Sequence, residues 1–372
     1  MADDTRADAG TTGVGTAGTG TAAGQQISDT FNGSAGASQA LKPKDPQGPP
    51  GPKGTVKGIQ AAAIPAFVAG QELADLGETD PRIVVLTADL AGAGRTADFR
   101  DRHPDRFFNM GVAEQNMISV AAGMAASGLR PYLSTFAAYV ALLGCEQIRT
   151  DLAYPGLPVR ILAHHSGMSL GYYGTSHHSL EDLSAMRAIA DLTVVCAADA
   201  NQLRAILRAS LDLAGPLYIR LGRGRDPEVY PEVPASFAFG RAVRLTEGRD
   251  LTLITAGSQV RPCLDAAALL AEQDGLAVRV VDMHTISPIN ADEAIAAATE
   301  TAAVMTVEEH NVTGGLGSAV AEVLLEAGAA VPFRRHGVPD EHVVLGPPAA
   351  LYAHYELDAA GIAARARRFL AP

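Results

Sequence analysis

The sequence predicts an α/β protein made of two doubly wound α/β domains that follow a disordered N-terminal tail. Three observations support this fold class. Apolar runs of strand length alternate with helix-length segments from residue 58 onward. A linker rich in Pro and Glu, placed at 229–239, interrupts the alternation, and a shorter alternating series follows it. The segment 1–57 shows no apolar periodicity and is dominated by small residues.

The first domain, 58–228, contains continuous apolar runs of the kind that form buried parallel strands. In chain order, strands are expected at 82–90, 130–136, 158–166, 193–199 and 216–222. Each run is paired with a segment that has apolar residues at helical spacing. These helices are expected at 63–81, 113–128, 137–154, 178–190 and 201–215, the first stopped by Asp80 and Pro81 and the second by Gly128.

The second domain, 240–372, repeats the alternation on a smaller scale and predicts a second parallel sheet. Strands are expected at 251–260, 278–288 and 302–310, and a helix at 317–328. The segment 1–57 contains GPPGP, which is too short for a collagen helix. It is interpreted as a solvated tail, with a docking arm as the alternative.

Composition excludes several classes of protein. Hydrophobic residues make up 47% and charged residues 19%, and the net charge is −12. So acidic a chain is a poor candidate for binding nucleic acid or an anionic membrane, and no apolar run is long enough to span a bilayer. Without a signal-like start, and with only Cys145, Cys196 and Cys263, it is expected to be cytoplasmic with reduced thiols. No protein-built metal site is expected.

A glycine motif after the first expected strand resembles a dinucleotide fingerprint. Gly92, Gly94 and Ala97 fit G-x-G-x-x-A, and Glu114 lies at the spacing of a ribose-binding acid. However, three residues separate the strand from the first glycine, and Glu114 begins a helix instead of ending a strand. A nicotinamide site is therefore the weaker interpretation.

Glu114 is the most informative single residue. It lies at the first turn of an apolar helix within FFNMGVAEQNMISVAAG. Apolar surroundings disfavour the ionised carboxylate, whereas a helix N-terminus favours it. A group poised between the two forms can share a proton with a ring nitrogen. The alternative is a glutamate that only complements the helix dipole.

MGVAEQNM closely resembles the G-[IV]-A-E-Q segment of thiamine-diphosphate enzymes of the transketolase family. STFAAYVALLGCEQIR, AHHSGMSLGYYGTSHHSLEDLSAMR, PLYIRLGR and VEEHNVTGGLGSAV resemble later blocks of that family in the same order. The resemblance covers residues 58–372. It implies the C-terminal subunit of a split transketolase, with a pyrimidine-binding domain and a smaller C-terminal domain.

The resemblance implies a cofactor site on this chain. Glu114 would hydrogen-bond N1′ of the aminopyrimidine, Phe136 would stack on that ring, and Tyr139 would complete the aromatic wall. Asp89 would lie near the cofactor, or it could cap the next helix instead. Without the resemblance, Phe136 would be taken for ordinary strand core.

Four histidines, His164, His165, His177 and His178, gather around one polar loop. The resemblance implies that His165 and His177 are catalytic and hydrogen-bond the substrate. A solvated loop and a metal site are the alternatives. No carboxylate or cysteine shares the spacing, so no metal ligand is assigned.

The resemblance places Arg220 where relatives bind a sugar phosphate, with Arg223 and Arg225 beside it. An interdomain salt bridge is the alternative for Arg220. The block that contains Glu308, Glu309, His310 and the glycines after them is expected to have a packing role.

The sequence departs from the family at one loop. The usual G-E-D-G-x-[ST]-H has become GYYGTSH, so Tyr172 and Tyr173 replace an acidic pair. A neutral tyrosine hydroxyl cannot replace a carboxylate that meets a donor hydroxyl. Tyr173 is kept as a substrate-binding candidate, and an altered two-carbon donor or acceptor is expected.

No G-D-G segment, which holds diphosphate and Mg²⁺ in this family, occurs in the chain. A partner chain carrying the diphosphate domain is therefore expected, most simply in a heterotetramer. The predicted activity is transfer of a two-carbon ketol unit from a ketose-type donor to an aldehyde-type acceptor, in carbohydrate metabolism. The alternatives are a 2-oxo-acid dehydrogenase β-like chain, a deoxyketose-phosphate synthase-like enzyme, or a non-catalytic scaffold subunit.

Overall fold

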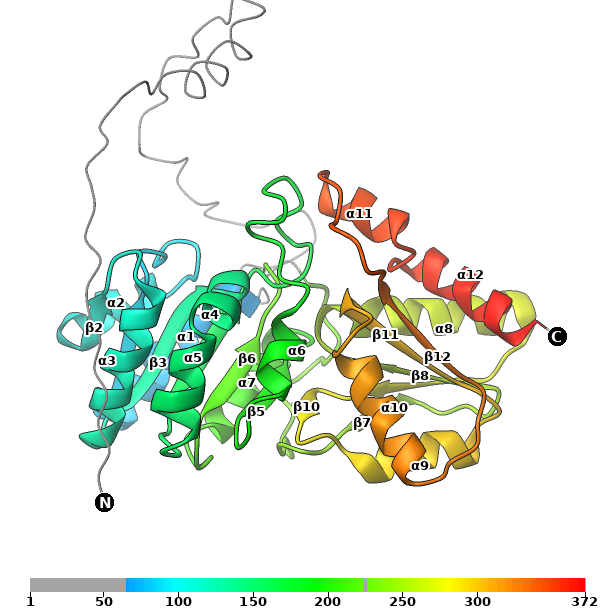
Figure 1. Ribbon diagram of the computed structural model, residues 1–372, viewed down its shortest axis with the longest axis horizontal. Coiled ribbons are helices and arrows are strands. Elements are labelled where there is room, and N and C mark those ends of the chain that lie inside the picture. The colour runs from blue at the N-terminus through cyan, green and yellow to red at the C-terminus, as the bar shows by residue number, and fades with distance from the viewer. Residues whose placement is uncertain (1–64, 224–225, 372) are drawn as a thin grey trace, which may run out of the picture. The chain divides into compact units, whose positions relative to one another are not determined.

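The computed structural model describes residues 65–223 and 226–371. The predicted tail and Arg225 lie outside the described residues. The described chain contains two sheets covered by helices, which confirms the predicted fold class (Figure 1).

The first sheet has seven strands, all parallel except one at an edge. In spatial order they are β10 (Thr285–Ser287), β5 (Thr193–Cys196), β6 (Leu217–Arg220), β4 (Arg160–His164), β3 (Arg130–Phe136), β1 (Ile83–Thr87) and β2 (Phe107–Asn109). Most of these strands are apolar on both faces, as buried parallel strands require.

Helices cover both faces of this sheet, so the sheet is doubly wound. One face packs against α1 (Pro65–Thr79), α2 (Ala97–Arg102) and α7 (Ala200–Ala209). The other face packs against α3 (Glu114–Ala126), α4 (Ala137–Leu143) and α6 (Asp182–Arg187). Alternate residues of each strand enter the two cores, because successive side chains of a strand point to opposite faces.

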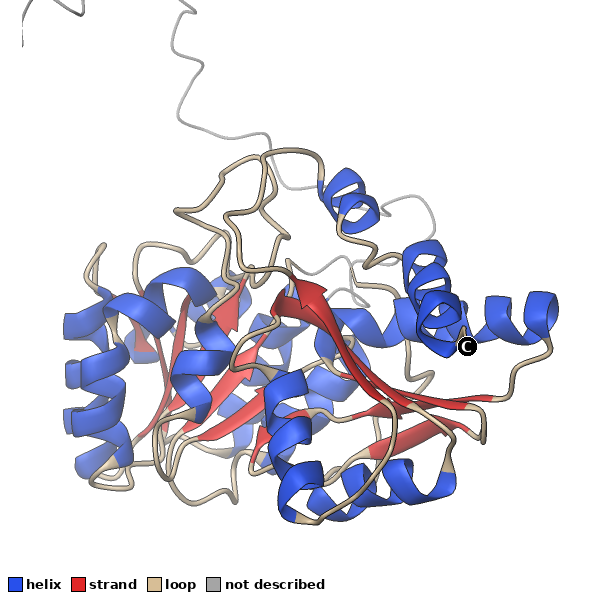
Figure 2. Cartoon of the chain, turned by 45° about the vertical axis from the view of Figure 1, so that its right-hand side comes forward, coloured by secondary structure: helices blue, strands red, loops and turns tan. Residues whose placement is uncertain are grey.

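The second sheet has five strands, and only β7 runs antiparallel. In spatial order they are β12 (Phe333–Val338), β11 (Val304–Asn311), β8 (Leu251–Thr255), β9 (Val278–Asp282) and β7 (Val243–Thr246). Helices α8 (Val260–Asp274) and α12 (Ala359–Leu370) cover one face, and α9 (Ala291–Glu300) and α10 (Leu316–Glu326) cover the other. A short helix, α11 (Pro348–His354), precedes α12 (Figure 2).

Local chemistry explains several helix starts. The side chains of Asp199, Asn290 and Asp358 each accept a backbone hydrogen bond from the first turn of α7, α9 and α12 respectively. Such caps satisfy N–H groups that have no partner within the helix.

Two expected elements are divided in the structure. The helix expected at 137–154 breaks at Gly144 into α4, α5 (Cys145–Gln147) and a π-helical segment, Ile148–Ala153. A Cβ at Gly144 would lie 2.3 Å from Ile118 Cδ1, so close packing requires glycine there. The strand expected at 278–288 turns after Asp282, and its second part, β10, joins the first sheet instead of the second.

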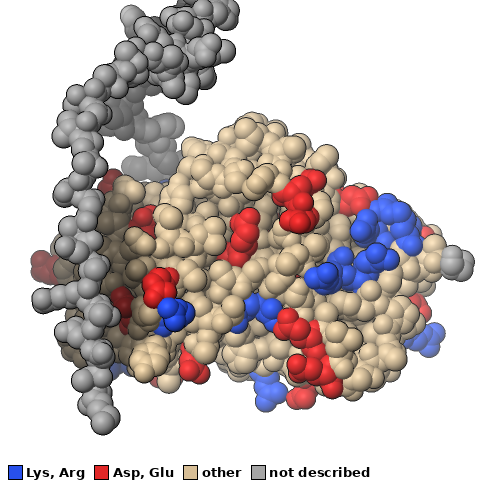
Figure 3. Space-filling model, in the orientation of Figure 1, with Lys and Arg blue, Asp and Glu red and all other residues tan. Residues whose placement is uncertain are grey.

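Asp and Glu side chains are spread over the face of the molecule in Figure 3, whereas Arg and Lys gather mainly toward α12. All three cysteines are free thiols. Burial raises the pKa of Cys196 and of Cys263 to about 12, so neither is a reactive thiolate. Within the described residues, no helix combines the length and apolar character that crossing a membrane requires.

Candidate active site

The predicted site residues gather at the carboxyl edge of the first sheet, where open α/β sheets bind ligands. Strands β4, β3 and β1 are parallel neighbours, so the segments that follow them emerge together. Phe136, the last residue of β3, is directly paired with His164, the last residue of β4. Glu114 follows β2 and begins α3.

Glu114 is buried, with only 6% of the residue exposed. Its carboxylate accepts one long hydrogen bond from Thr135 Oγ1, at 3.4 Å. Burial and the nearby Glu114 charge together raise the pKa of Tyr139, which places the two side chains in the same site. The carboxylate thus keeps acceptor capacity for a ligand.

Phe136 is the centre of a group of rings. Its ring centroid lies 5.6 Å from Tyr139, 4.8 Å from His165 and 5.8 Å from His177. His164 meets it edge-on at 5.2 Å. These rings, tilted by 54° to 84° relative to that of Phe136, form an aromatic wall against which a heterocycle can pack.

The segment 165–181, hereafter the histidine loop, follows β4. Its His177 is held at both ring nitrogens: Nε2 lies 2.8 Å from Tyr139 Oη, and Nδ1 lies 2.8 Å from Ser176 Oγ. Tyr173 packs on the same imidazole, with ring centroids 4.8 Å apart. The loop therefore presents an oriented imidazole beside the aromatic wall.

His164 and His165 form a neutral pair. Their Nδ1 atoms lie 2.7 Å apart, so one ring donates and the other accepts. Burial lowers the pKa of His165 to about 4, helped by the charges of Arg223, Arg95 and His177. Burial also holds the pKa of His164 far below its usual range. His165 has a left-handed backbone, with φ of 59°, a strained conformation that is common at functional sites.

Asp89 lies at the exposed rim and does not cap a helix. Its carboxylate accepts a hydrogen bond from Asn109 Nδ2 at 2.8 Å, and its own N–H donates to Asn109 Oδ1 at 3.0 Å. The same Asn109 oxygen accepts from Gly111 N, at 3.1 Å. This pair fixes the turn that leads into Glu114.

Arg220 is not presented to a substrate. It is buried, and its guanidinium donates to Asp182 at 2.8 Å and to the carbonyls of Ser179 and Glu309 at 3.0 Å. The ion pair with Asp182 lies within the first domain, and the hydrogen bond to the Glu309 carbonyl connects Arg220 to the second domain. The neighbouring Arg223 is exposed and close enough to His165 to influence its charge.

A cavity of about 690 Å³ adjoins the histidine loop and the C-terminal domain. Ser169, Tyr172, Arg223, Ser258 and Tyr352 are among its lining residues. Tyr172 and Tyr173 are 68% and 61% exposed, so neither is part of the core. None of Glu114, Phe136, Tyr139, His165 and His177 is among the residues that line it.

The residues present fit a planar, amine-bearing ring. The Glu114 carboxylate can accept further hydrogen bonds, and it lies beside the Phe136 wall. Below the wall, Ser134 Oγ and His164 Nε2 are buried without a hydrogen-bond partner. A Cβ at Gly94 would lie 2.3 Å from the first atom and 2.7 Å from the second, so Gly94 leaves space for His164.

Within 65–223 and 226–371, no three His, Cys, Asp or Glu side chains are grouped to hold a metal ion. A second cavity, of about 560 Å³, lies between β12, α11 and α12, with Arg334, Arg335 and Arg365 in its lining. It contains none of the predicted site residues.

Sequence reasoning missed Asn109, Gly94, Thr135 and the role of Glu309. Asparagine side chains often hydrogen-bond the backbone two residues on, and Gly111 two residues after Asn109 could have indicated that turn. No local signal indicates the others, because their partners are distant in the chain.

Comparisons with known proteins agree with this geometry. Residues 66–227 match the transketolase pyrimidine-binding domain, and residues 240–362 match the transketolase C-terminal domain. The chain is 38% identical to an apulose-4-phosphate transketolase subunit of Phocaeicola vulgatus, over 80% of this chain and 95% of that protein. It is 40% identical to the 6-deoxy-6-sulfo-D-fructose transketolase subunit SqwH of Clostridium sp., over 72% of this chain and 82% of that protein.

A solved structure described as a split gene transketolase, inactive beta4 tetramer, has 42% sequence identity and a TM-score of 0.73. The match covers 82% of this chain and 96% of that one. The chain therefore belongs to the transketolase family, in which it matches the subunits that carry the pyrimidine-binding and C-terminal domains.

Proposed function

We propose that this chain binds the pyrimidine half of thiamine diphosphate and supports transfer of a two-carbon ketol unit from a ketose-type donor to an aldehyde-type acceptor. The observation that carries the proposal is the buried Glu114 carboxylate, weakly engaged by Thr135, the residue before Phe136, and close enough to Tyr139 to raise its pKa. When bound, the cofactor supplies a carbon nucleophile that attacks the donor carbonyl. Glu114 shares a proton with the pyrimidine N1′, and Phe136 orients the ring.

His165 and His177 act on the substrate. Both imidazoles face the Phe136 wall, and His177 is oriented by Tyr139 and Ser176. His165 stays neutral at pH 7 and its Nδ1 already pairs with His164, so its Nε2 can make one hydrogen bond to the substrate. These properties suit binding of a carbonyl and relay of protons between substrate oxygens.

We infer that the substrate carries an anionic end. Arg223 lines the cavity beside the histidine loop, and both Arg223 and Arg95 act on the charge of His165. Arginine suits phosphate and sulfonate oxygens. The names of the two relatives above contain a sugar phosphate and a sulfo sugar. Both sugars are anionic, which agrees with arginine side chains near the site. Tyr172 and Tyr173 favour a sugar that lacks a hydroxyl where the family's acidic pair would bind one.

A partner chain completes the proposed site by holding Mg²⁺ and the diphosphate. Exposed apolar side chains flank Glu114: Val112 is 80% exposed, and Leu142 and Leu143 are 53% and 57% exposed. Gln115 donates to Leu143 O at 2.9 Å, which joins these residues into one surface at the start of α3 and the end of α4. We propose this surface as the docking site of the diphosphate subunit in a heterotetramer.

Co-expression with a candidate diphosphate subunit tests the function. Calorimetry with thiamine diphosphate and Mg²⁺ should show binding by the complex and none by the chain alone. Glu114→Gln should retain cofactor binding and lower ketol transfer by about 100-fold or more, because it removes the shared proton. The exposed Glu146, which pairs with Arg149, provides the control Glu146→Gln.

Full activity of Glu114→Gln, or cofactor turnover by the lone chain, would overturn the proposal. Decarboxylation of pyruvate by the complex, without ketol transfer, would favour the oxo-acid alternative.

A further inference from the structure

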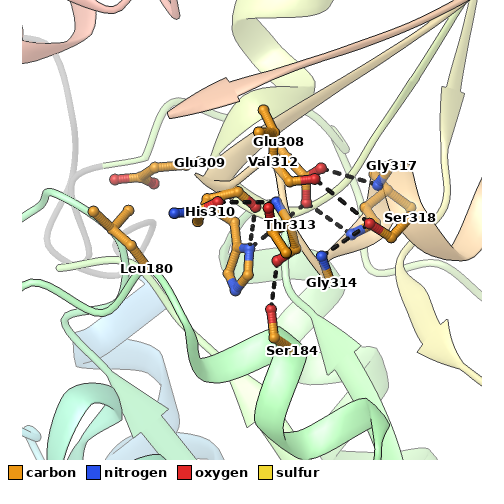
Figure 4. A network of polar contacts seen from close by, with 12 residues as sticks. Leu180, Ser184, Glu308, Glu309, His310, Val312, Thr313, Gly314, Gly317 and Ser318 are labelled. Atoms are coloured by element: carbon orange, nitrogen blue, oxygen red, sulfur yellow. Dashed lines mark hydrogen bonds and ion pairs between the residues drawn. The ribbon is translucent and has the colours of Figure 1, made fainter. Parts of the chain in front are cut away.

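The C-terminal domain contacts the histidine loop at several points, and the buried carboxylate side chain of Glu309 makes one of these contacts. Glu308 and Glu309 are adjacent on β11, and each is only 3% exposed. Figure 4 shows that their side chains diverge. Glu308 accepts from Leu316 N and Gly317 N at the start of α10, whereas Glu309 points away from that helix.

Three donors hold the Glu309 carboxylate. Met168 N–H of the histidine loop donates to Oε1 at 2.7 Å, and Tyr352 Oη donates to the same atom at 2.7 Å. Ser258 Oγ donates to Oε2 at 2.5 Å. Ser258 and Tyr352 belong to the C-terminal domain, so they fix the carboxylate there, and the remaining contact fixes the loop.

Met168, which Glu309 binds, lies next to the point where the two ends of the histidine loop pair with each other. Gly167 and Ser179 exchange two backbone hydrogen bonds, of 2.9 Å and 3.0 Å. His165 lies two residues before Gly167, and His177 lies two residues before Ser179. Fixing the backbone at Met168 therefore fixes the positions of both imidazoles.

The loop has no spare room at this contact. A Cβ at Gly167 would lie 2.2 Å from the Glu309 carboxylate, and Gly167 has a φ of 61° that favours glycine. Elsewhere along the loop, Gly346 N–H donates to Gly171 O at 3.1 Å and Asn311 N–H donates to Leu180 O at 2.9 Å, so two backbone contacts with the C-terminal domain accompany that of Glu309.

We propose that Glu309 is a positioning residue, which holds His165 and His177 at the reacting centre from the C-terminal domain by binding the backbone of Met168. The inference rests on the proposed function, since it assigns the two histidines to catalysis. It gives the C-terminal domain a direct part in the geometry of the site, beyond packing.

Titration of His165 in the full-length chain, followed by NMR with labelled histidine, reports the loop without requiring turnover. In the wild type, burial together with Arg223, Arg95 and His177 keeps this imidazole neutral near pH 5. In Glu309→Ala the loop should move toward solvent, so the pKa of His165 should rise toward its ordinary value. Hydrogen exchange of the amides of the histidine loop should also become faster.

A second variant reaches the same contact from the loop side. Gly167→Ala leaves Glu309 bonded to Ser258 and Tyr352 but drives the loop away, so it should reproduce the histidine titration of Glu309→Ala. Glu309→Gln keeps an oxygen that can accept from Met168 N–H, and it should stay close to the wild type. Glu308→Gln changes an equally buried carboxyl group that binds the start of α10 instead of the loop, so it should leave the titration and the loop exchange unchanged, whatever its effect on stability.

In the complex with the diphosphate subunit, Glu309→Ala should lower kcat by about 100-fold, because small misplacements of catalytic groups cost that much. The proposal fails if Glu309→Ala and Gly167→Ala both titrate like the wild type, or if Glu308→Gln shifts His165 equally. If the loop measurements come out as expected while Glu114→Gln stays fully active, the proposed function fails and the effect of Glu309 on the loop stands.

Discussion

At the scale of single residues, two arginines three positions apart have opposite surroundings. Arg220 is the last residue of β6, inside the sheet, and its ion pair with Asp182 is buried on both sides, at 6% and 0% exposure. Arg223 follows the strand and is exposed beside the histidine loop. A buried pair is costly to break from one side, because the remaining charge loses its partner.

Arg220→Ala should lower the free energy of unfolding by about 3–5 kcal/mol, since it leaves Asp182 buried and unpaired. Arg223→Ala should leave stability within about 0.5 kcal/mol, as exposed substitutions usually do. It should raise the KM of an anionic ketose by about 10-fold or more, the loss expected for a hydrogen bond to a charged group. Urea unfolding and steady-state kinetics of the complex separate the two effects. Equal KM values for wild type and Arg223→Ala would remove Arg223 from the substrate site.

At the scale of elements, the loop between β1 and α2 shows how a motif can mislead. Its glycines fit a dinucleotide fingerprint, but their use is different. Gly94 leaves space for His164 and Ser134, whereas a Cβ at Gly92 would meet nothing within 4 Å. The two glycines differ in what packs against them. The spacing of glycines in the sequence motif carries no information about that packing.

Gly94→Ala should therefore displace His164 and the adjacent His165, lowering stability by about 1–3 kcal/mol and reducing turnover. Gly92→Ala should change neither by a measurable amount. Parallel unfolding and activity measurements on the two variants provide the check. Tolerance of alanine at both positions would mean that the loop is not part of the site's support.

The linker between the domains is anchored by a carboxyl group that favours its protonated form. Asp282 is buried at the end of β9, and burial raises its pKa to about 7. Its Oδ2 accepts from Tyr230 Oη of the linker at 2.7 Å and from Gln202 Nε2 at 2.6 Å. An acid whose pKa is raised by folding loses stability as pH rises from its unfolded pKa through its folded pKa.

Asp282→Asn stays neutral at every pH while keeping an acceptor for Tyr230. The free energy of unfolding of Asp282→Asn minus that of the wild type should therefore increase by about 3 kcal/mol between pH 5 and pH 8. Urea unfolding of both proteins at the two pH values measures this difference. Stability curves that run parallel across this range would show that Asp282 is ionised in the folded protein.

Strand periodicity predicted most of the first sheet, because parallel strands buried on both faces are continuous apolar runs. Glu114, Phe136, Tyr139, His165 and His177 were all predicted, and the structure places them together, since each follows or ends a strand of one sheet. The burial of Arg220 in an ion pair with Asp182, and the pairing of β10 with the first sheet, could not be predicted from the sequence. Both depend on contacts between segments far apart in the chain.

At the scale of the whole molecule, the described chain builds only part of the proposed cofactor site. One side of Glu114 is closed by Thr135 and the aromatic wall. Val112, two residues before Glu114, and Leu143, whose carbonyl accepts from Gln115, are apolar and exposed. Large exposed apolar side chains grouped beside a functional carboxylate mark a surface that another chain covers.

Leu143→Asp should therefore cause a loss of about 100-fold in affinity for the diphosphate subunit, because a charge would be buried without a partner. Folding of the chain should not change, since the side chain is exposed. Leu325→Asp supplies a matched control, because Leu325 is 81% exposed on α10 in the C-terminal domain. Sedimentation velocity of the mixed subunits measures both. If Leu143→Asp assembled as tightly as the control, the partner would have to approach Glu114 from another direction, and the exposed leucines would need a different occupant.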